Sequence, residues 1–189
     1  MIGSLEKFNK LVEALEALPT IGKKSASRLA YHMVMKDSFA GIKIAHAIEE
    51  ALSSLRECSS CGGMSEDELC FVCCDERRDG SLLCIVESAK DILLLEENNL
   101  FDGKYFVLES LEDFNLVKLE KVVKTGVKEI VFALTPSIAN DALMLYIEDK
   151  LSNFSINYTK IAQGVPTGVS LENIDLLSLA RALSGRVKV

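Results

Sequence analysis

Residues 58–73 read CSSCGGMSEDELCFVC and carry two Cys-x-x-Cys pairs, Cys58 with Cys61 and Cys70 with Cys73. Two thiolates two residues apart can bind one cation from a tight turn, and a second pair completes a tetrahedral shell of four sulfurs. The segment around them is short and polar, with too little apolar material to order itself. The spacing therefore predicts a bound metal ion that supplies folding free energy, a structural zinc ion first of all.

The alternatives to zinc are two structural disulfides, four ordinary buried thiols, or an iron ion in a rubredoxin-like site. Disulfides belong to secreted proteins, whereas the chain opens with MIGSLEK and lacks the basic flank and apolar core of a signal peptide. We therefore expect a cytoplasmic protein with reduced thiols. Cys74 and Cys84 stand outside the two pairs and are expected to be ordinary thiols rather than ligands.

Composition narrows the class of protein further. The chain has 189 residues, of which 49% are hydrophobic and 26% charged, as is typical of a globular protein with one or two small domains. No stretch approaches the roughly 20 apolar residues of a membrane span, so an integral membrane role is excluded. The net charge of −7 means that a nucleic-acid binder of this composition must concentrate its basic residues locally.

The first third of the sequence has the apolar spacing of three helices. Helical stripes cover residues 5–18 and 26–34, and the first stops before Pro19 because the residue preceding a proline is pushed out of the helical region. A third helix is expected from about residue 39 to residue 55. We expect its apolar stripe to be buried; the stripe consists of Ile42, Ala45, Ile48, Leu52 and Leu55.

The turn between the first two helices, LPTIGKKSASRL at residues 18–29, resembles a helix-hairpin-helix. In that motif, hairpin amides and the start of the second helix point at a DNA phosphate. Lys23, Lys24 and Arg28 add cations at the same point, and the last two share one helix face. The alternative is an αα-hairpin with solvated charges, and Thr20 stands where the motif usually has glycine.

Beyond residue 80, short apolar runs alternate with helical patterns. This order predicts a parallel or mostly parallel sheet with covering helices. The first run, LLCIV at residues 82–86, is continuous, as in a strand that is buried on both faces. We expect the other strands at 105–108, 129–134 and 157–162, and helices at 89–97, 115–124, 138–152 and 176–183.

Glu87 directly follows the strand at 82–86, at an end where side chains of a parallel sheet face a binding crevice. Asp91 either faces the same crevice or caps the next helix. Glu87 resembles the first acid of a Toprim domain, the metal-binding fold of topoisomerases and primases, whose enzymes add an Asp-x-Asp after a later strand. Here that strand runs into TPSIAND with no acid before Asp141. We therefore expect a Toprim-like scaffold that binds rather than cleaves.

Four motifs, in this order, resemble the RecR family of bacterial recombination mediators over essentially the whole chain. They are LPTIGKKSASRLA at 18–30, the two cysteine pairs, CIVESAKD at 84–91 and GVPTGVSLE at 164–172. The resemblance implies an α/β multi-module fold. Its modules would be a helix-hairpin-helix domain at 1–55, a four-cysteine zinc finger at 56–79, a Toprim-like domain at 80–163, and a Walker B-like motif with an oligomerisation tail at 164–189.

The resemblance also implies a function in recombinational DNA repair without catalysis. Such a protein is cytoplasmic and nucleoid-associated, forms a ring-like tetramer or a dimer, and binds single- and double-stranded DNA. Its partners are RecO and in some cases RecF, and it helps RecA displace single-strand-binding protein. The alternative is a magnesium-dependent nuclease or topoisomerase-like enzyme of the Toprim type.

Site residues follow from the same resemblance. One structural Zn²⁺ per chain would be held by Cys58, Cys61, Cys70 and Cys73. DNA would be contacted by Lys23, Lys24 and Arg28. Partners would bind an acidic surface with Glu87, Asp91 and Asp141, and chains would meet through Leu5, Phe8 and Val12. Two segments depart from the family pattern, 105–114, which lacks a glycine- and proline-containing loop, and 135–141, which lacks a Gly-Glu pair.

Overall fold

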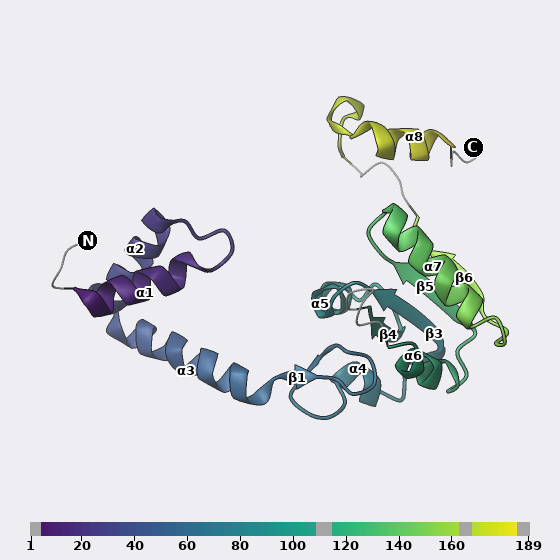
Figure 1. Ribbon diagram of the computed structural model, residues 1–189, viewed down its shortest axis with the longest axis horizontal. Coiled ribbons are helices and arrows are strands. Elements are labelled where there is room, and N and C mark those ends of the chain that lie inside the picture. The colour runs from purple at the N-terminus through teal and green to yellow at the C-terminus, as the bar shows by residue number, and fades with distance from the viewer. Residues whose placement is uncertain (1–4, 109–114, 163–167, 185–189) are drawn as a thin grey trace. The chain divides into compact units, whose positions relative to one another are not determined.

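The computed structural model describes residues 5–108, 115–162 and 168–184 (Figure 1). The chain divides into two compact units, Met1–Leu55 and Arg56–Val189. The first unit is helical, whereas the second contains the cysteine pairs and a four-stranded sheet. These features confirm the predicted α/β multi-module fold. No described helix combines the length and the apolar character needed to cross a membrane.

In the first unit, α1 (Glu6–Glu16) packs against α2 (Lys23–Tyr31). A π-helical turn, His32–Lys36, leads into α3 (Ser38–Ser54), whose first turn is capped by the Asp37 carboxylate. The hairpin core is small: Val12, Ala26 and Ala30 are buried, and Phe8, Leu11, Leu15 and Ile21 pack on them. Val12, a predicted interface residue, is therefore buried within the hairpin itself.

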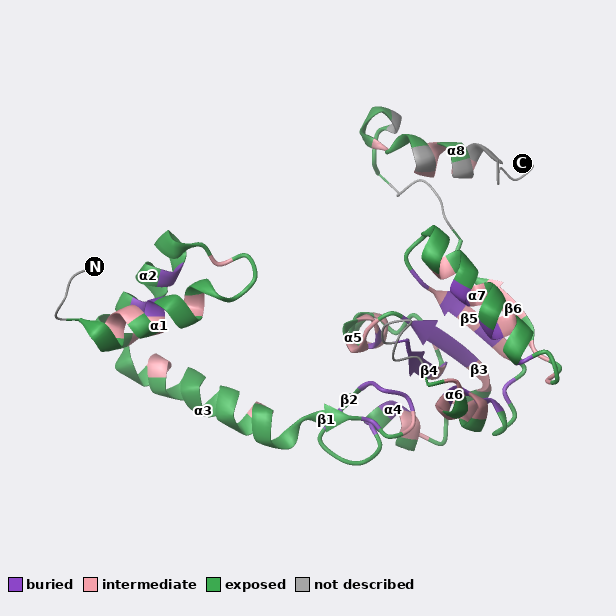
Figure 2. Ribbon diagram, in the orientation of Figure 1, coloured by how far each residue is buried: buried purple, intermediate pink, exposed green. Residues whose placement is uncertain are grey.

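The apolar stripe of α3 is exposed, so the prediction that it is buried was wrong (Figure 2). Ile42 is 58% exposed, Ile48 54% and Leu52 81%. The helical spacing was read correctly, but the described part of the first unit leaves these side chains exposed. Large exposed apolar patches mark surfaces that another molecule covers.

Thr20 in the hairpin turn has a φ of 68°, in the left-handed region. A β-branched residue is strained there, whereas glycine is not. Thr20→Gly is therefore expected to raise the free energy of unfolding by about 1 kcal/mol, as measured by denaturant unfolding of the full chain. Asn99→Gly is the matched control, because Asn99 also has a positive φ of 49° but asparagine tolerates it. A Thr20→Gly chain no more stable than the wild type would show that the turn is unstrained.

The second unit is built on a parallel sheet with the strand order β4-β3-β5-β6. Parallel strands need crossover connections, and each is made here by one helix, in agreement with the predicted alternation. The strands are β3 (Asp79–Val86), β4 (Gly103–Val107), β5 (Glu129–Ala133) and β6 (Asn157–Lys160). The helices are α5 (Ala89–Glu97), α6 (Leu116–Val123) and α7 (Ile138–Lys150), followed by the 3-10 turn η2 (Leu171–Asn173) and α8 (Leu176–Ser184).

The central strand β3 is buried on both faces, as predicted. Leu83 and Ile85 belong to a core that also contains buried side chains of α6 and α7. Cys84 and Val86 belong to a second core, which contains Ile92 of α5 and three of the paired cysteines. The cysteine segment forms the short strands β1 (Arg56–Glu57) and β2 (Met64–Ser65) and the short helix α4 (Phe71–Cys74). This segment therefore shares a core with the sheet.

Candidate metal centre and nucleic-acid interface

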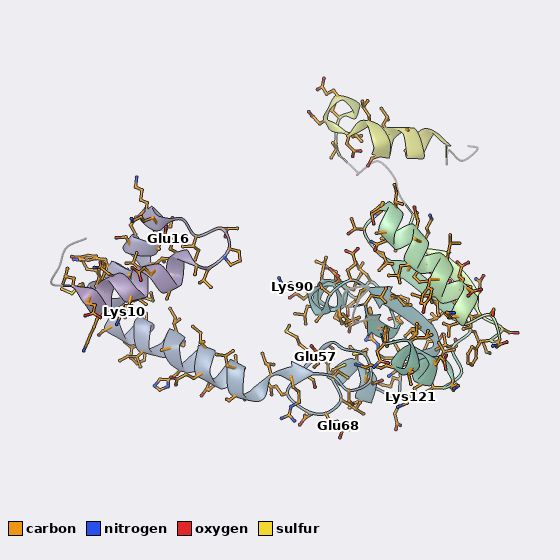
Figure 3. All side chains as sticks on the ribbon, viewed as in Figure 1. Lys10, Glu16, Glu57, Glu68, Lys90 and Lys121 are labelled. Carbon is orange, nitrogen blue, oxygen red and sulfur yellow. The ribbon has the colours of Figure 1, made fainter. Side chains whose placement is uncertain are left out.

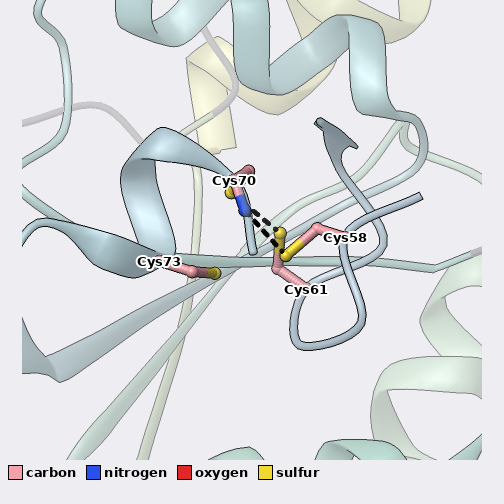
Figure 4. A group of neighbouring side chains, drawn as sticks. All are labelled: Cys58, Cys61, Cys70 and Cys73. Carbon is pink, nitrogen blue, oxygen red and sulfur yellow. Dashed lines mark hydrogen bonds between the residues drawn. The ribbon is translucent and has the colours of Figure 1, made fainter. Parts of the chain in front are cut away.

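The sulfurs of Cys58, Cys61, Cys70 and Cys73 all lie within 4.8 Å of one another (Figure 4). The Cys61 and Cys70 sulfurs are 3.6 Å apart. Four thiolates around one zinc ion at about 2.3 Å have their sulfurs about 3.8 Å apart, so the arrangement fits a tetrahedral metal centre. In the described part of the chain, no other group of three or more histidine, cysteine or acidic side chains is placed to hold a metal.

Backbone hydrogen bonds fix the turn that carries the first pair of cysteines. The Cys58 amide donates to the Gly63 carbonyl at 2.7 Å, and the Gly62 amide donates to the Cys58 carbonyl at 3.0 Å, which closes a tight turn. Gly62 has a φ of 78°, and a Cβ there would lie 3.2 Å from Cβ of Val107. Glycine is thus required where the turn meets the sheet.

Backbone amides also stabilise the sulfurs themselves. The Gly63 amide donates to Cys61 Sγ and the Cys70 amide to Cys58 Sγ, each at 3.3 Å. Hydrogen bonding to Cys70 and Cys73, together with burial, raises the pKa of the Cys61 thiol when no cation is present. A divalent cation reverses this effect because it stabilises all four thiolates.

The remaining cysteines lie outside the metal centre, as predicted. Cys74 is exposed, and neither Cys74 nor Cys84 belongs to the group of converging sulfurs. Cys84 is buried in β3, and burial raises its thiol pKa to about 12. It packs against the metal centre as an apolar side chain.

The hairpin presents two cations, Lys23 and Lys24, in the first turn of α2, and Arg28 follows in its last turn. Lys23, Lys24 and Arg28 are all exposed, and none makes an ion pair or side-chain hydrogen bond with another described residue. The first amides of a helix have no acceptor within it, and Gly22, the N-cap of α2, has no side chain to accept from them. The geometry combines free cations with the positive end of a helix dipole.

Glu87 is held by the loop that follows β5 and by the first turn of α7. Its carboxylate accepts from the Thr135 amide at 3.0 Å, the Thr135 hydroxyl at 2.7 Å and the Asn140 side-chain amide at 2.6 Å. The Thr135 hydrogen bonds lower the pKa of Glu87. Thr135 and Asn140 were not predicted from the sequence, although both follow a parallel strand, where side chains also face the crevice.

The other two predicted acids do not join Glu87 in a metal site. Asp91 caps α5, because its carboxylate accepts from the Ser88 amide at 2.8 Å in a reciprocal capping box. Asp141 lies in the first turn of α7, and its carboxylate is 3.7 Å from the Lys160 ammonium. The structure thus uses Asp91 as a helix cap, one of its two predicted roles.

Comparison with known proteins gives the family. Two family models match, one described as RecR, helix-hairpin-helix, over residues 8–52 and one as RecR, C-terminal, over residues 164–187. The chain is 59% identical over 190 residues to the Recombination protein RecR of a Nitratiruptor species, with 100% of both chains covered. The chain belongs to the RecR family.

Further RecR relatives have the same extent. The protein of Campylobacter jejuni (strain RM1221) is 50% identical over 190 residues, with 100% of both chains covered. That of Helicobacter pylori (strain Shi470) is 50% identical over 186 residues, covering 98% of this chain and 96% of the relative. Residues 109–114 of the segment that departs from the family pattern, and residues 164–167 of the motif at 164–172, lie outside the described residues. The division of the second unit at residues 79 and 163 stays a prediction.

Proposed function

We propose that the chain is a non-catalytic, DNA-binding recombination mediator that acts in DNA repair. The observation that carries this proposal is the hairpin at the start of α2, with Lys23, Lys24 and Arg28 exposed and unpaired among the described residues. Phosphates are bound at such a helix end by amides, dipole and cations together. The names of the full-length relatives support a role in recombination.

The metal in this proposal is one structural zinc ion per chain. Four thiolates leave no open coordination position for a substrate, and such closed sites contribute folding free energy rather than chemistry. Metal analysis of reduced protein distinguishes zinc from iron, because an iron tetrathiolate is coloured and a zinc tetrathiolate is not. We expect about one zinc per chain and no visible chromophore.

The absence of catalysis is also part of the proposal. Magnesium-assisted phosphoryl chemistry needs several carboxylates around the ion. Both Glu87 oxygens accept hydrogen bonds from Thr135 or Asn140, and Asp91 Oδ2 accepts from Ser88 in the cap of α5. These contacts support a Toprim-like scaffold that has become a binding surface.

For partners, we propose RecO, in some cases RecF, and through them RecA and single-strand-binding protein. Glu87, Asp91 and Asp141 are the proposed acidic partner surface. Asp141 offers the freer carboxylate, because its contact with Lys160 is long at 3.7 Å and its side chain is 54% exposed. The proposed location is the cytoplasm, in association with the nucleoid.

We propose a homo-oligomer, a tetramer or a dimer, because the exposed stripe of α3 needs a covering surface. Changing Ile48 and Leu52 to glutamate places two charges in this interface and is expected to reduce the particle mass at least twofold, as measured by light scattering. The matched control is Ala47→Glu with Ser54→Glu, which adds the same charges to the opposite face of α3 and should leave the mass unchanged. Equal masses for both variants would remove α3 from the interface.

The experiment that tests the proposed function mixes the full chain with a labelled single-stranded oligonucleotide in magnesium buffer. We expect a complex heavier than one 20.7 kDa chain plus DNA, from which the oligonucleotide is recovered uncut. DNA cleavage by the wild type that is lost in the Glu87→Gln variant would instead support the alternative, a Toprim-type enzyme. If the protein has the mass of a single chain both in the absence and in the presence of DNA, the proposed oligomer is contradicted.

A further inference from the structure

Lys104 of β4 closes the turn that carries the second cysteine pair. Its ammonium donates to the carbonyls of Val72 at 2.8 Å, Cys73 at 3.3 Å and Asp75 at 2.8 Å. An ammonium group has three donors, so these carbonyls use all of them. Lys104 has no ion pair among the described residues, so its positive charge lies unneutralised against the backbone of the metal-binding turn.

Lys118 of α6 occupies the equivalent place at the first cysteine pair. Its ammonium donates to the Cys58 carbonyl at 3.3 Å. A Cβ on Gly62 would lie 3.9 Å from the same nitrogen, so the ammonium sits beside the turn between Cys58 and Cys61. This lysine also lacks an ion pair within the described ranges. Each cysteine pair therefore has one unneutralised, partly buried cation against its backbone.

The charge of the metal centre explains why two cations are placed there. Four thiolates and one divalent cation leave two negative charges in a buried core, where charges without partners are strongly destabilising. Arg78 cannot balance them, because its guanidinium lies over the Tyr105 ring and is already paired with the Glu96 carboxylate. Lys104 and Lys118 together carry the two positive charges that the centre lacks.

We propose that Lys104 and Lys118 are positioning residues of the metal centre, which hold the two cysteine turns and neutralise the net charge of the metal tetrathiolate. Neither touches the metal. This inference rests on the proposed zinc ion. Outer partners of metal ligands typically change metal affinity by about 10- to 100-fold, so the predicted consequence is slow metal release that depends on both lysines.

The test measures zinc release from the full chain into an excess of the chromogenic chelator 4-(2-pyridylazo)resorcinol. Lys104→Met and Lys118→Met keep most of the side-chain bulk and remove the charge, and each is expected to speed release by about tenfold. Lys104→Arg keeps the charge, and its rate of zinc release is expected to be closer to that of the wild type. Lys121→Met is the matched control, since Lys121 lies on the same helix as Lys118, α6, but is exposed (Figure 3).

A second readout separates charge from simple tethering of the backbone. With Co²⁺ in place of zinc, loss of a nearby positive charge raises the energy of the sulfur lone pairs. The sulfur-to-cobalt charge-transfer band should therefore move to lower energy in both methionine variants, while the ligand-field bands keep their tetrahedral pattern. If Lys104→Met does not fold, the test is made with Lys118→Met alone, because the Lys118 ammonium makes a single hydrogen bond to the described residues and its loss is less disruptive.

Two results would overturn the inference. One is release from both methionine variants at the rate of Lys121→Met. The other is faster release with an unshifted charge-transfer band, which would mean that the lysines only tether the turns. A wild-type chain that binds no zinc would instead remove the proposed cofactor, and this inference with it.

Discussion

Removal of the metal is expected to unfold the sheet of the second unit, and not only the segment with the cysteine pairs. Cys58, Cys61 and Cys70 are between 0% and 3% exposed and share a core with Val86 of β3 and Val107 of β4. The Val107 amide also donates to the Cys61 carbonyl at 2.8 Å, so the turn continues the edge of the sheet. Structural zinc in small peptides contributes about 10–16 kcal/mol, as much as the whole stability of a typical domain.

Hydrogen exchange of the full chain, with metal and after chelation, measures this effect segment by segment. We expect β3 and β4 to lose their protection without metal, whereas α1 and α2 keep theirs, because the hairpin has its own core. Cys61→Ser should reproduce the chelated state. Cys74→Ser is the matched control, since Cys74 is exposed and is not a ligand. Sheet protection that survives in Cys61→Ser would show that the metal stabilises only its own loop.

Replacement of both Lys24 and Arg28 by alanine is expected to weaken DNA binding by roughly 10- to 100-fold at moderate salt. Both side chains are exposed on one face of α2 and have no competing acid among the described residues. Phosphate contacts carry no sequence information, so we expect the same loss for oligonucleotides of different sequence. Fluorescence anisotropy with a labelled single strand measures the change.

A matched control for this double variant removes two cations elsewhere in the same unit. Lys10 lies on α1, where it pairs with Glu6 at 2.7 Å (Figure 3), and Lys43 lies exposed on α3. Lys10→Ala with Lys43→Ala changes the net charge by the same amount and should leave the affinity within about twofold, because distant exposed charges are screened. Equal losses in the two double variants would mean that net charge, rather than the hairpin, binds DNA.

The elements of the sheet were predictable because each rests on local information. The run at 82–86 alternates between two cores in the structure, Leu83 and Ile85 in one and Cys84 in the other. A continuous apolar run carries this information by itself. Strand β3 nevertheless begins at Asp79, earlier than predicted, because its first residues are polar and follow no hydrophobic pattern.

The candidate metal ligands were also predictable, since the four converging cysteines are those of the two Cys-x-x-Cys pairs. The side chains that support these cysteines were not predictable. Lys104 and Lys118 lie 31 and 60 residues from the cysteines whose carbonyls they contact, and only the packing of the sheet brings them together. From a single sequence, a lysine in a strand or an amphipathic helix is expected to be a solvated charge.

The exposed stripe of α3 shows a different limit of sequence reasoning. Periodicity identifies Ile42, Ile48 and Leu52 as an apolar face, but it does not tell whether the covering surface belongs to the same chain. The Toprim-like acid gives a third case. Glu87 was placed correctly at a strand end, yet neither the loop residue Thr135 nor Asn140 in the first turn of α7 is marked by periodicity as its partner.

The salt dependence of DNA binding tests the central claim, that the hairpin of α2 binds phosphates, most directly. Affinity for a labelled single strand is measured over a series of salt concentrations for the wild type and for Lys24→Ala with Arg28→Ala. We expect the logarithm of the affinity to fall linearly with the logarithm of the salt concentration, with a slope that is smaller in the variant by roughly one for each side chain removed. Identical slopes for the two proteins would contradict the claim.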